Sequence, residues 1–315
     1  MNFYSIPVKA PERKKNPDSS QKVAWFRICT WNANRFVKKK IVAANWKMNL
    51  THKEVKSYLD RFWAEVGEVN EVQVVFIPSF TSIPAFADAL EESPNFSELG
   101  AQDMHWEQGG AFTGEISAGM LQALRVKHVV IGHSERRQWF GESDAIVAKK
   151  TAAALQSGLH PILCIGESLA ERDGDRVEEV LERQLRKGLG DCSARDLGSV
   201  VIAYEPVWAI GTGKTATAAQ AQEAHAFIRS VLVSTFDLAT AESVRIQYGG
   251  SVKPENAQVL MAQKDVDGAL VGAACLNAES FARIVQCADK EQPTSIALVL
   301  RSNYTGKNDV CFAVY

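Results

Sequence analysis

The chain of 315 residues carries an acid, an imidazole and an ammonium group, each shortly after an apolar run. Glu205 follows the run at 199–204, His133 follows the run at 128–132, and Lys47 stands three residues beyond the run at 39–44. A carboxylate that emerges from an apolar run is partly desolvated, which raises its pKa and its basicity. The position of Glu205 therefore predicts a base that abstracts a proton.

The other polar groups fit the same chemistry. His133 directly precedes an expected helix start at Ser134 and Glu135, and a helix N-terminus disfavours an imidazolium ion. We therefore expect a neutral ring that donates a hydrogen bond to a substrate oxygen as charge develops there. Lys47 supplies the positive charge that an anionic substrate or an enediolate needs, and Asn45 adds a neutral donor.

Two glycine-rich turns suggest a phosphate site. They are Gly249-Gly250-Ser251 and Gly272-Ala273, where backbone N–H groups can approach an anion without an intervening side chain. Taken singly, each candidate has an ordinary explanation: a solvated lysine, a core histidine, a paired glutamate or a plain turn. It is their common place after successive apolar runs that favours a functional site.

The segment "YEPVWAIGTGKTA" at 204–216 resembles a nucleotide-binding loop but fails both tests for one. A P-loop needs a glycine where this chain has Trp208. A dinucleotide fingerprint must directly follow its strand, whereas five residues separate Glu205 from Gly211. We interpret the segment as a mobile lid with hinges at 206–208 and 214–216, which would exclude water from Glu205 when it closes.

Seven apolar runs and a weaker eighth candidate, SELGAQ at 97–102, predict the elements that position these groups. The runs end at Ala44, Ile77, Ala101, Ile131, Ile165, Tyr204, Tyr248 and Val271, with 23 to 44 residues between successive ends. Each interval fits one strand and one helix, and "THKE" at 51–54 and "TAAQ" at 217–220 are capping boxes. The pattern predicts a single closed (β/α)8 barrel, in which the carboxyl ends of all strands meet at one face. A doubly wound open sheet is the alternative, but it would hardly bring these residues together.

Composition excludes several classes. With 46% hydrophobic and 23% charged residues the chain is an ordinary globular one, and no apolar run approaches the roughly 20 residues of a membrane helix. Six cysteines without a Cys-x-x-Cys pair indicate reduced thiols in the cytosol. Residues 1–40 have a net charge of +8 and the remainder −10, so the main domain is not expected to bind nucleic acid.

The motifs together resemble the triosephosphate isomerase family. They are "AANWKMN" (43–49), "VIGHSERR" (130–137), "AYEPVWAIGTGKTA" (203–216) and "YGGSV" (248–252), and the similarity covers about residues 38–288. The resemblance implies interconversion of dihydroxyacetone phosphate and glyceraldehyde 3-phosphate, a step of glycolysis and gluconeogenesis, with no metal or organic cofactor. It gives Glu205, His133, Lys47 and Asn45 the catalytic roles.

The same resemblance implies further roles. Gly211, Ser251 and Gly272 would bind phosphate through their backbone, beside Gly249, Gly250 and Ala273, while Ser134 and Glu135 would support the site. Thr113 would reach the active site of a second subunit in a homodimer. One departure is Ala273, where the family usually has glycine; a requirement for positive φ would cost on the order of 1 kcal/mol there. We expect a modest rise in KM at most.

Residues 1–37 and 289–315 lie outside the resemblance. The basic segment 1–37, which we expect to be poorly ordered, could be a targeting sequence, a nucleic-acid-binding arm or sequence upstream of a true start at Val37; the intact mass of protein from its source would decide. In the tail, "IALVL" and "VCFAVY" could form a hairpin, but disorder or a shifted reading frame is at least as consistent. Its role stays open.

Two other functions compete. A Schiff-base aldolase needs a desolvated lysine inside the barrel, but the residue after the run at 199–204 is Glu205. A non-catalytic scaffold that uses its basic arm to bind nucleic acid would leave the polar groups unexplained, and its binding would depend on salt and on residues 1–37.

Overall fold

The computed structural model describes residues 4–7, 25–28, 38–91, 97–211 and 215–289. The chain divides into two units: Met1–Val37 together with Gln292–Tyr315, and Lys38–Glu291. In the first unit, strands β1 (Tyr4–Pro7) and β2 (Trp25–Ile28) pair antiparallel. The hairpin considered for the tail lies outside the described residues. The second unit holds everything that the site requires.

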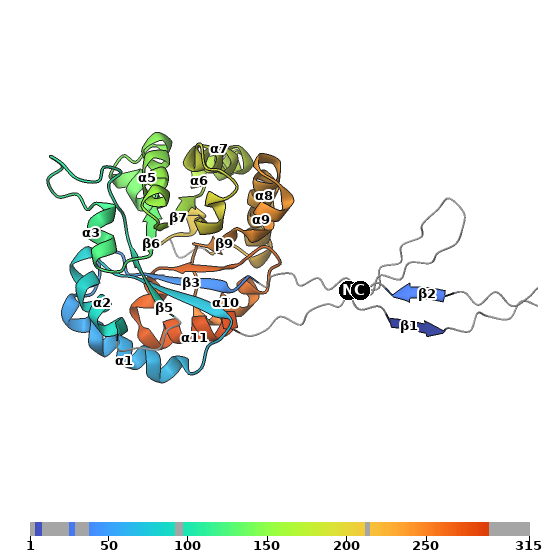
Figure 1. The fold of residues 1–315 in the computed structure, drawn as a ribbon, viewed down its shortest axis with the longest axis horizontal. Helices are drawn as coiled ribbons and strands as arrows, with labels where there is room; N and C mark the ends of the chain where they lie inside the picture. Colours follow the sequence, from blue (N-terminus) through green and yellow to red (C-terminus); the bar gives the residue numbers. More distant parts are fainter. Residues whose placement is uncertain (1–3, 8–24, 29–37, 92–96, 212–214, 290–315) are drawn as a thin grey trace, which may run out of the picture. The chain divides into compact units, whose positions relative to one another are not determined.

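The second unit is a closed barrel of eight parallel strands (Figure 1). The strands are β3 (Lys40–Asn45), β4 (Val72–Ile77), β5 (Ser97–Ala101), β6 (His128–Ile131), β7 (His160–Ile165), β8 (Val201–Tyr204), β9 (Arg245–Tyr248) and β10 (Gly268–Val271). Their order is β10-β3-β4-β5-β6-β7-β8-β9, so the first and last strands pair and close the ring. This confirms the predicted fold, although β3 extends one residue further than expected, to Asn45.

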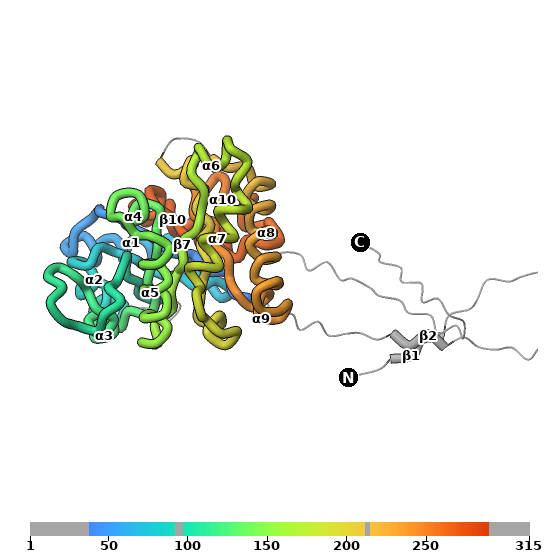
Figure 2. Tube along the Cα trace, turned by 90° about the horizontal axis from the view of Figure 1, so that it is seen from above, coloured from blue at the N-terminus to red at the C-terminus, as the bar shows by residue number. Residues whose placement is uncertain are grey.

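Helices surround the strands, as the tube in Figure 2 also shows. The α-helices are α1 (Val55–Val66), α2 (Ile83–Glu91), α3 (Ala118–Ala123), α4 (Ser134–Trp139), α5 (Asp144–Gln156), α6 (Leu169–Asp173), α7 (Val177–Leu189), α8 (Ala218–Thr235), α9 (Leu238–Ser243), α10 (Pro254–Met261) and α11 (Ala278–Asp289). Short 3-10 helices are η1 (His52–Glu54), η2 (Phe80–Ser82), η3 (Asp196–Ser199), η4 (Val207–Ala209) and η5 (Ala273–Leu276). Both predicted capping boxes form, at Thr51 and Thr217.

Alternation along the strands creates two separate cores. One set of side chains fills the inside of the barrel, and the larger set packs between strands and helices. On β3, for example, Ile41 and Ala43 belong to the inner core, whereas Val42 and Ala44 face the helices. Strands that are buried on both faces explain why the runs read as continuously apolar in the sequence.

The ring closes at a glycine. Gly268, the first residue of β10, pairs with Ile41 of β3 and has φ of 145°, a conformation that residues with side chains rarely adopt. A Cβ atom at this position would overlap the backbone of Ile41. The close approach of the last strand to the first therefore requires glycine here.

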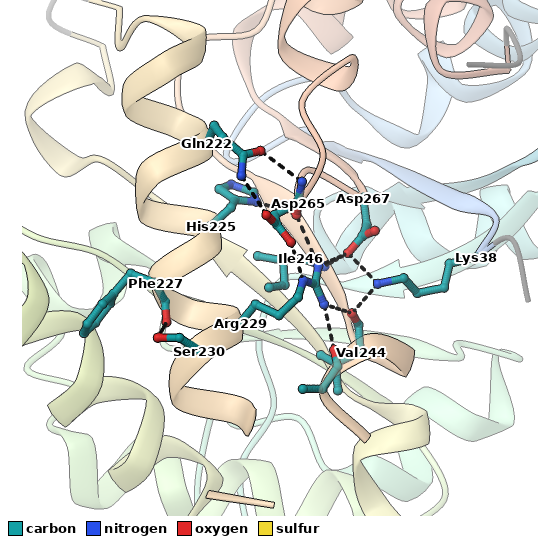
Figure 3. A network of polar contacts seen from close by, with 11 residues as sticks. Lys38, Gln222, His225, Phe227, Arg229, Ser230, Val244, Ile246, Asp265 and Asp267 are labelled. Carbon is teal, nitrogen blue, oxygen red and sulfur yellow. Dashed lines mark hydrogen bonds and ion pairs between the residues drawn. The ribbon is translucent and has the colours of Figure 1, made fainter. Parts of the chain in front are cut away.

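A buried polar network ties the start of the barrel to its end (Figure 3). Arg229 of α8 donates to Asp265 Oδ1 at 2.8 Å and to Asp267 Oδ2 at 2.7 Å. Lys38, two residues before β3, reaches the same Asp267 oxygen at 3.1 Å, and the N–H of Ile246 in β9 donates to it at 2.9 Å. The network thus joins the segment before the first barrel strand to α8 and the last two strands.

Two composition-based expectations also concern the fold. In the described part of the chain, no helix is long and apolar enough to cross a membrane. Within the same part, Cys164, Cys192, Cys275 and Cys287 are free thiols. The other two cysteines, Cys29 and Cys311, lie outside the described residues.

His225 gives this fold a testable pH dependence. It lies fully buried on α8, with Nδ1 3.2 Å from the carbonyl oxygen of Asp265, and burial lowers its pKa from 6.5 to about 4. The ring must stay neutral in the folded protein, whereas the unfolded chain binds a proton below its ordinary pKa. Stability from this residue is therefore complete above pH 6.5 and is lost as the pH falls towards 4.

We expect the free energy of unfolding, measured with denaturant, to fall by about 3 kcal/mol across that window because of His225. The comparison with His225→Gln isolates the effect, since other buried groups titrate in both proteins. Equal pH dependence of the two proteins would contradict this assignment.

Candidate active site at the carboxyl end of the barrel

Parallel strands place the predicted groups at one rim. Asn45 ends β3, His133 stands two residues beyond β6, and Glu205 directly follows β8. The backbone N–H of Glu205 donates to the carbonyl of Ile165 at 2.8 Å, which continues the pairing of β8 with β7. The strand register therefore fixes where the carboxylate of Glu205 leaves the barrel.

Glu205 and His133 meet directly. Glu205 Oε1 lies 2.9 Å from His133 Nε2, and Glu205 Oε2 accepts the backbone N–H of Ser134 at 2.9 Å. The carboxylate is 2% exposed and the imidazole 5%, so the contact is screened from water. Two residues that are 72 positions apart in the chain thus form one buried acid–imidazole pair.

The backbone around His133 defines its protonation pattern. His133 is the N-cap residue of α4, and its Nδ1 accepts the N–H of Glu135 at 3.1 Å. A ring nitrogen that accepts a hydrogen bond carries no proton, so the proton of a neutral ring lies on Nε2 and points at Glu205. This geometry agrees with the expected neutral donor.

The pKa directions differ from those predicted. Burial raises the pKa of Glu205, but His133, the Ser134 N–H and Lys47 together lower it below its ordinary value. Burial likewise lowers the pKa of His133, but the charge and the hydrogen bond of Glu205 together raise it by more, so the net shift of the His133 pKa is upward. The predictions of a raised Glu205 pKa and a lowered His133 pKa were therefore wrong for this arrangement, because they omitted the contact between the two side chains.

Lys47 is held from three sides. Its ammonium lies 2.5 Å from Glu135 Oε1, its backbone N–H donates to Asn45 Oδ1 at 3.0 Å, and its carbonyl accepts from Gln102 at 2.7 Å. Its φ of 52° is unfavourable for a residue with a side chain, and such conformations persist where the surroundings fix them. Glu135 also lies near His133, with 3.6 Å between Oε2 and Nδ1, and so links the ammonium to the acid–imidazole pair.

The glycine turns border this group. Gly249 donates its N–H to the carbonyl of Tyr204 at 2.7 Å, and a Cβ there would lie 2.9 Å from Cγ of Glu205. A Cβ at Gly250 would overlap the Tyr248 hydroxyl, while one at Gly272 would lie 3.4 Å from Cε of Lys47. The turns after β9 and β10 therefore lie beside the two charged side chains.

Other predicted residues lie apart from these contacts. Gly211 is exposed with φ of 69°, and it precedes residues 212–214, which include the expected lid tip and part of its second hinge and lie outside the described residues. The carbonyl of Ser251 accepts from Asn256 at 3.0 Å. Thr113 is exposed on the loop between β5 and α3.

The departure at Ala273 carries no backbone strain. Ala273 begins η5, and among the described residues the non-glycine residues with positive φ are Lys47, Leu50, Arg125 and Asp175. The condition under which alanine would have been costly is therefore not met.

Sequence reasoning missed the anchor of the first hinge. Glu167 is fully buried, and its Oε1 accepts from Trp208 Nε1 at 2.7 Å, from Arg172 at 2.8 Å and from the Tyr204 hydroxyl at 3.1 Å. Trp208 belongs to the predicted hinge at 206–208, so the carboxylate of Glu167 holds this segment in place. The signal was available: Glu167 follows the apolar run at 160–166, as Glu205 follows the run at 199–204.

In the part of the chain that the structure describes, no group of three or more His, Cys, Asp or Glu residues could hold a metal ion. The donors at the rim are a carboxylate, an imidazole, an ammonium group and backbone N–H groups, which can move protons and stabilise negative charge.

Comparisons with known proteins agree with this geometry. A family model described as triosephosphate isomerase matches residues 40–288. The triosephosphate isomerase of Moorella thermoacetica is 53% identical over 249 residues, covering 79% of this chain and 98% of that protein. Those of Geobacter metallireducens and Trichlorobacter lovleyi are 51% and 50% identical, each covering 78% of this chain and 97% of the relative.

The relaxed backbone at Ala273 yields a prediction. We expect Ala273→Gly to change KM for a phosphorylated substrate by less than about twofold, because there is no strain to relieve. Steady-state kinetics checks this, with Ala274→Gly in the same 3-10 helix as the control for added backbone freedom. A roughly tenfold lower KM in Ala273→Gly alone would show that the methyl group obstructs phosphate.

Proposed function

The chain belongs to the triosephosphate isomerase family, and we propose that Glu205, His133 and Lys47 are its catalytic residues. The protein is an intramolecular aldose–ketose isomerase that interconverts dihydroxyacetone phosphate and D-glyceraldehyde 3-phosphate. We assign this activity to residues 38–288 and treat 1–37 and 289–315 as appended segments. The direct contact of a buried carboxylate with a buried imidazole is the observation that carries the assignment of residues.

Glu205 serves as the base. It removes a proton from the carbon next to the substrate carbonyl and returns it to the neighbouring carbon, so an enediolate forms between the two transfers. To reach substrate, the carboxylate must leave His133 Nε2 and the Ser134 N–H. Because these donors lower its pKa, leaving them in a site closed to water raises the basicity of Glu205 at the moment of proton abstraction.

His133 and Lys47 stabilise the charge that develops. Once Glu205 turns away, the Nε2 proton of His133 is free to donate to the substrate carbonyl oxygen, while the Glu135 N–H keeps Nδ1 unprotonated. The ammonium of Lys47 adds a fixed positive charge, and Asn45 holds the Lys47 backbone through its amide oxygen. Preorganised donors of this kind supply a large part of the rate enhancement in enzymes.

The phosphate binds at the glycine turns. We assign it to the backbone N–H groups around Gly249, Gly250, Ser251 and Gly272, with Ala273 alongside and Gly211 completing the site when the lid closes. The support is proximity: the turns after β9 and β10 border Glu205 and Lys47. Loops after the last two strands are a common phosphate site in barrels of this kind.

We further propose that two copies form a homodimer in the cytosol. Large apolar side chains are exposed near the site: Met48 at 95% and Phe112 at 42% on loops, and Trp139 at 71% and Phe140 at 67% at the end of α4. Exposed apolar groups of this size favour a protein–protein interface, and Thr113 stands next to Phe112 on the same loop. Free thiols such as Cys192 are consistent with a reducing compartment.

The catalytic assignment is tested with Glu205→Asp. Withdrawing the carboxylate by one methylene should lower kcat on the order of 10²-fold or more, while KM changes little. A coupled assay of glyceraldehyde 3-phosphate isomerisation measures both constants. The control is Glu223→Asp, at an exposed position of α8, which should retain full activity. Unchanged kcat in Glu205→Asp would remove Glu205 from the role of base.

The dimer is tested by sedimentation. The protein should sediment with about twice the chain mass of 34.6 kDa, and Phe112→Asp should shift it towards one chain. Leu238→Asp is the matched control, because Leu238 is exposed on α9 and outside the proposed interface. Monomeric wild-type protein at micromolar concentration would contradict the proposal.

A further inference from the structure

A buried cluster of four charges lies beside the site without belonging to it. Lys150 of α5 reaches Asp103 Oδ1 at 2.6 Å and Glu142 Oε1 at 2.5 Å. Arg136 of α4 reaches Asp103 Oδ2 at 2.9 Å and Glu142 Oε1 at 2.6 Å. Lys150, Asp103 and Glu142 are buried, and Arg136 is partly exposed. We call these four residues the charge cluster.

Two members of the charge cluster adjoin the residues that hold Lys47. Asp103 follows Gln102, whose amide donates to the Lys47 carbonyl at 2.7 Å. Arg136 follows Glu135, whose carboxylate lies 2.5 Å from the Lys47 ammonium. The ion pair between Asp103 and Arg136 therefore connects the loop that holds one end of Lys47 to the helix that holds the other.

Lys47 needs such a connection. With φ of 52° its backbone is in a conformation that costs energy for any residue with a side chain, so it can relax if its partners move. Gln102 directly follows β5, whereas Glu135 lies on α4, which follows β6. The pairing of β5 with β6, the strand before α4, places the two segments side by side, and a direct contact between them fixes their separation further.

We propose that Asp103, with Arg136, Glu142 and Lys150, is a positioning residue that keeps Lys47 in place for the reaction; this rests on the proposed role of Lys47. The charge cluster contains two acids and two bases. Removal of one partner leaves a buried charge uncompensated, which is strongly unfavourable. The cluster therefore holds β5, α4 and α5 in one arrangement.

The two acids of the cluster differ in their ionisation. Burial raises the pKa of Asp103, and the nearby Glu142 adds to this, against the opposing effects of Lys150 and Arg136. For Glu142, by contrast, Lys150 and Arg136 outweigh burial and lower the pKa. Burial thus favours the neutral form of Asp103, whereas Lys150 and Arg136 favour the ionised form of Glu142.

The test is a double-mutant cycle between Asp103→Asn and Lys47→Met, measured as kcat/KM well below the melting temperature. Asp103→Asn alone should lower kcat/KM about ten- to a hundredfold by displacing the ammonium. In the Lys47→Met background the same substitution should have little further effect, because there is no ammonium left to position. Equal effects in both backgrounds would overturn the proposal.

Controls separate positioning from folding and from the proposed function. Asp60→Asn removes a carboxylate from the exposed pair with Lys56 and should leave kcat/KM unchanged. If Asp103→Asn does not fold, the cycle is run with Lys150→Arg, which keeps the charge and changes the geometry, and the same criterion applies. If Lys47→Met alone retains full kcat/KM, the role proposed for Lys47 fails and this proposal fails with it, whereas a loss in Lys47→Met with additive effects of Asp103→Asn overturns only the positioning role.

Discussion

The contact between Glu205 and Nε2 of His133 is the constraint around which the site is arranged. A carboxylate that is 2% exposed would be very unfavourable alone, and here it is satisfied by an imidazole N–H and by the backbone N–H of Ser134. Both donors come from the start of α4, so the position of one short helix sets the charge state of the base. These contacts keep the polar groups of the site paired.

The environment of Lys47 shows how the barrel supports a strained residue. Its backbone is held by Asn45 from β3 and by Gln102, which directly follows β5, and its ammonium is held by Glu135 from α4. These partners come from three separate strand–helix units, so the cost of the unfavourable backbone is spread over the fold. A loop by itself would relax, whereas a rim built from parallel strands can keep such a conformation.

The sequence predicted the architecture well, because most strands are buried on both faces and therefore read as apolar runs. β5, with the sequence SELGA and partly exposed Ser97 and Glu98, gave the weakest signal. Glu205, His133 and Lys47 were recognisable for the same reason, since each follows such a run. The pKa directions of Glu205 and His133 were not predictable, because they depend on a contact between residues 72 positions apart. Glu167 follows an apolar run, as Glu205 does, but no local pattern shows that its partner is Trp208. The charge cluster could not be predicted either, because its members come from separate elements.

Gly268 links the packing at the amino end of the barrel to the position of residues at its carboxyl end. It lies at the amino end of β10, at the opposite end of the barrel from Glu205. The last strand, β10, can pair with the first, β3, only because Gly268 has no side chain. Any larger residue at position 268 would push β10 away from β3. Gly272 and Lys47 lie just beyond the carboxyl ends of these two strands. A substitution at the amino end of the barrel would thus displace its carboxyl end, where Gly272 and the ammonium of Lys47 lie side by side.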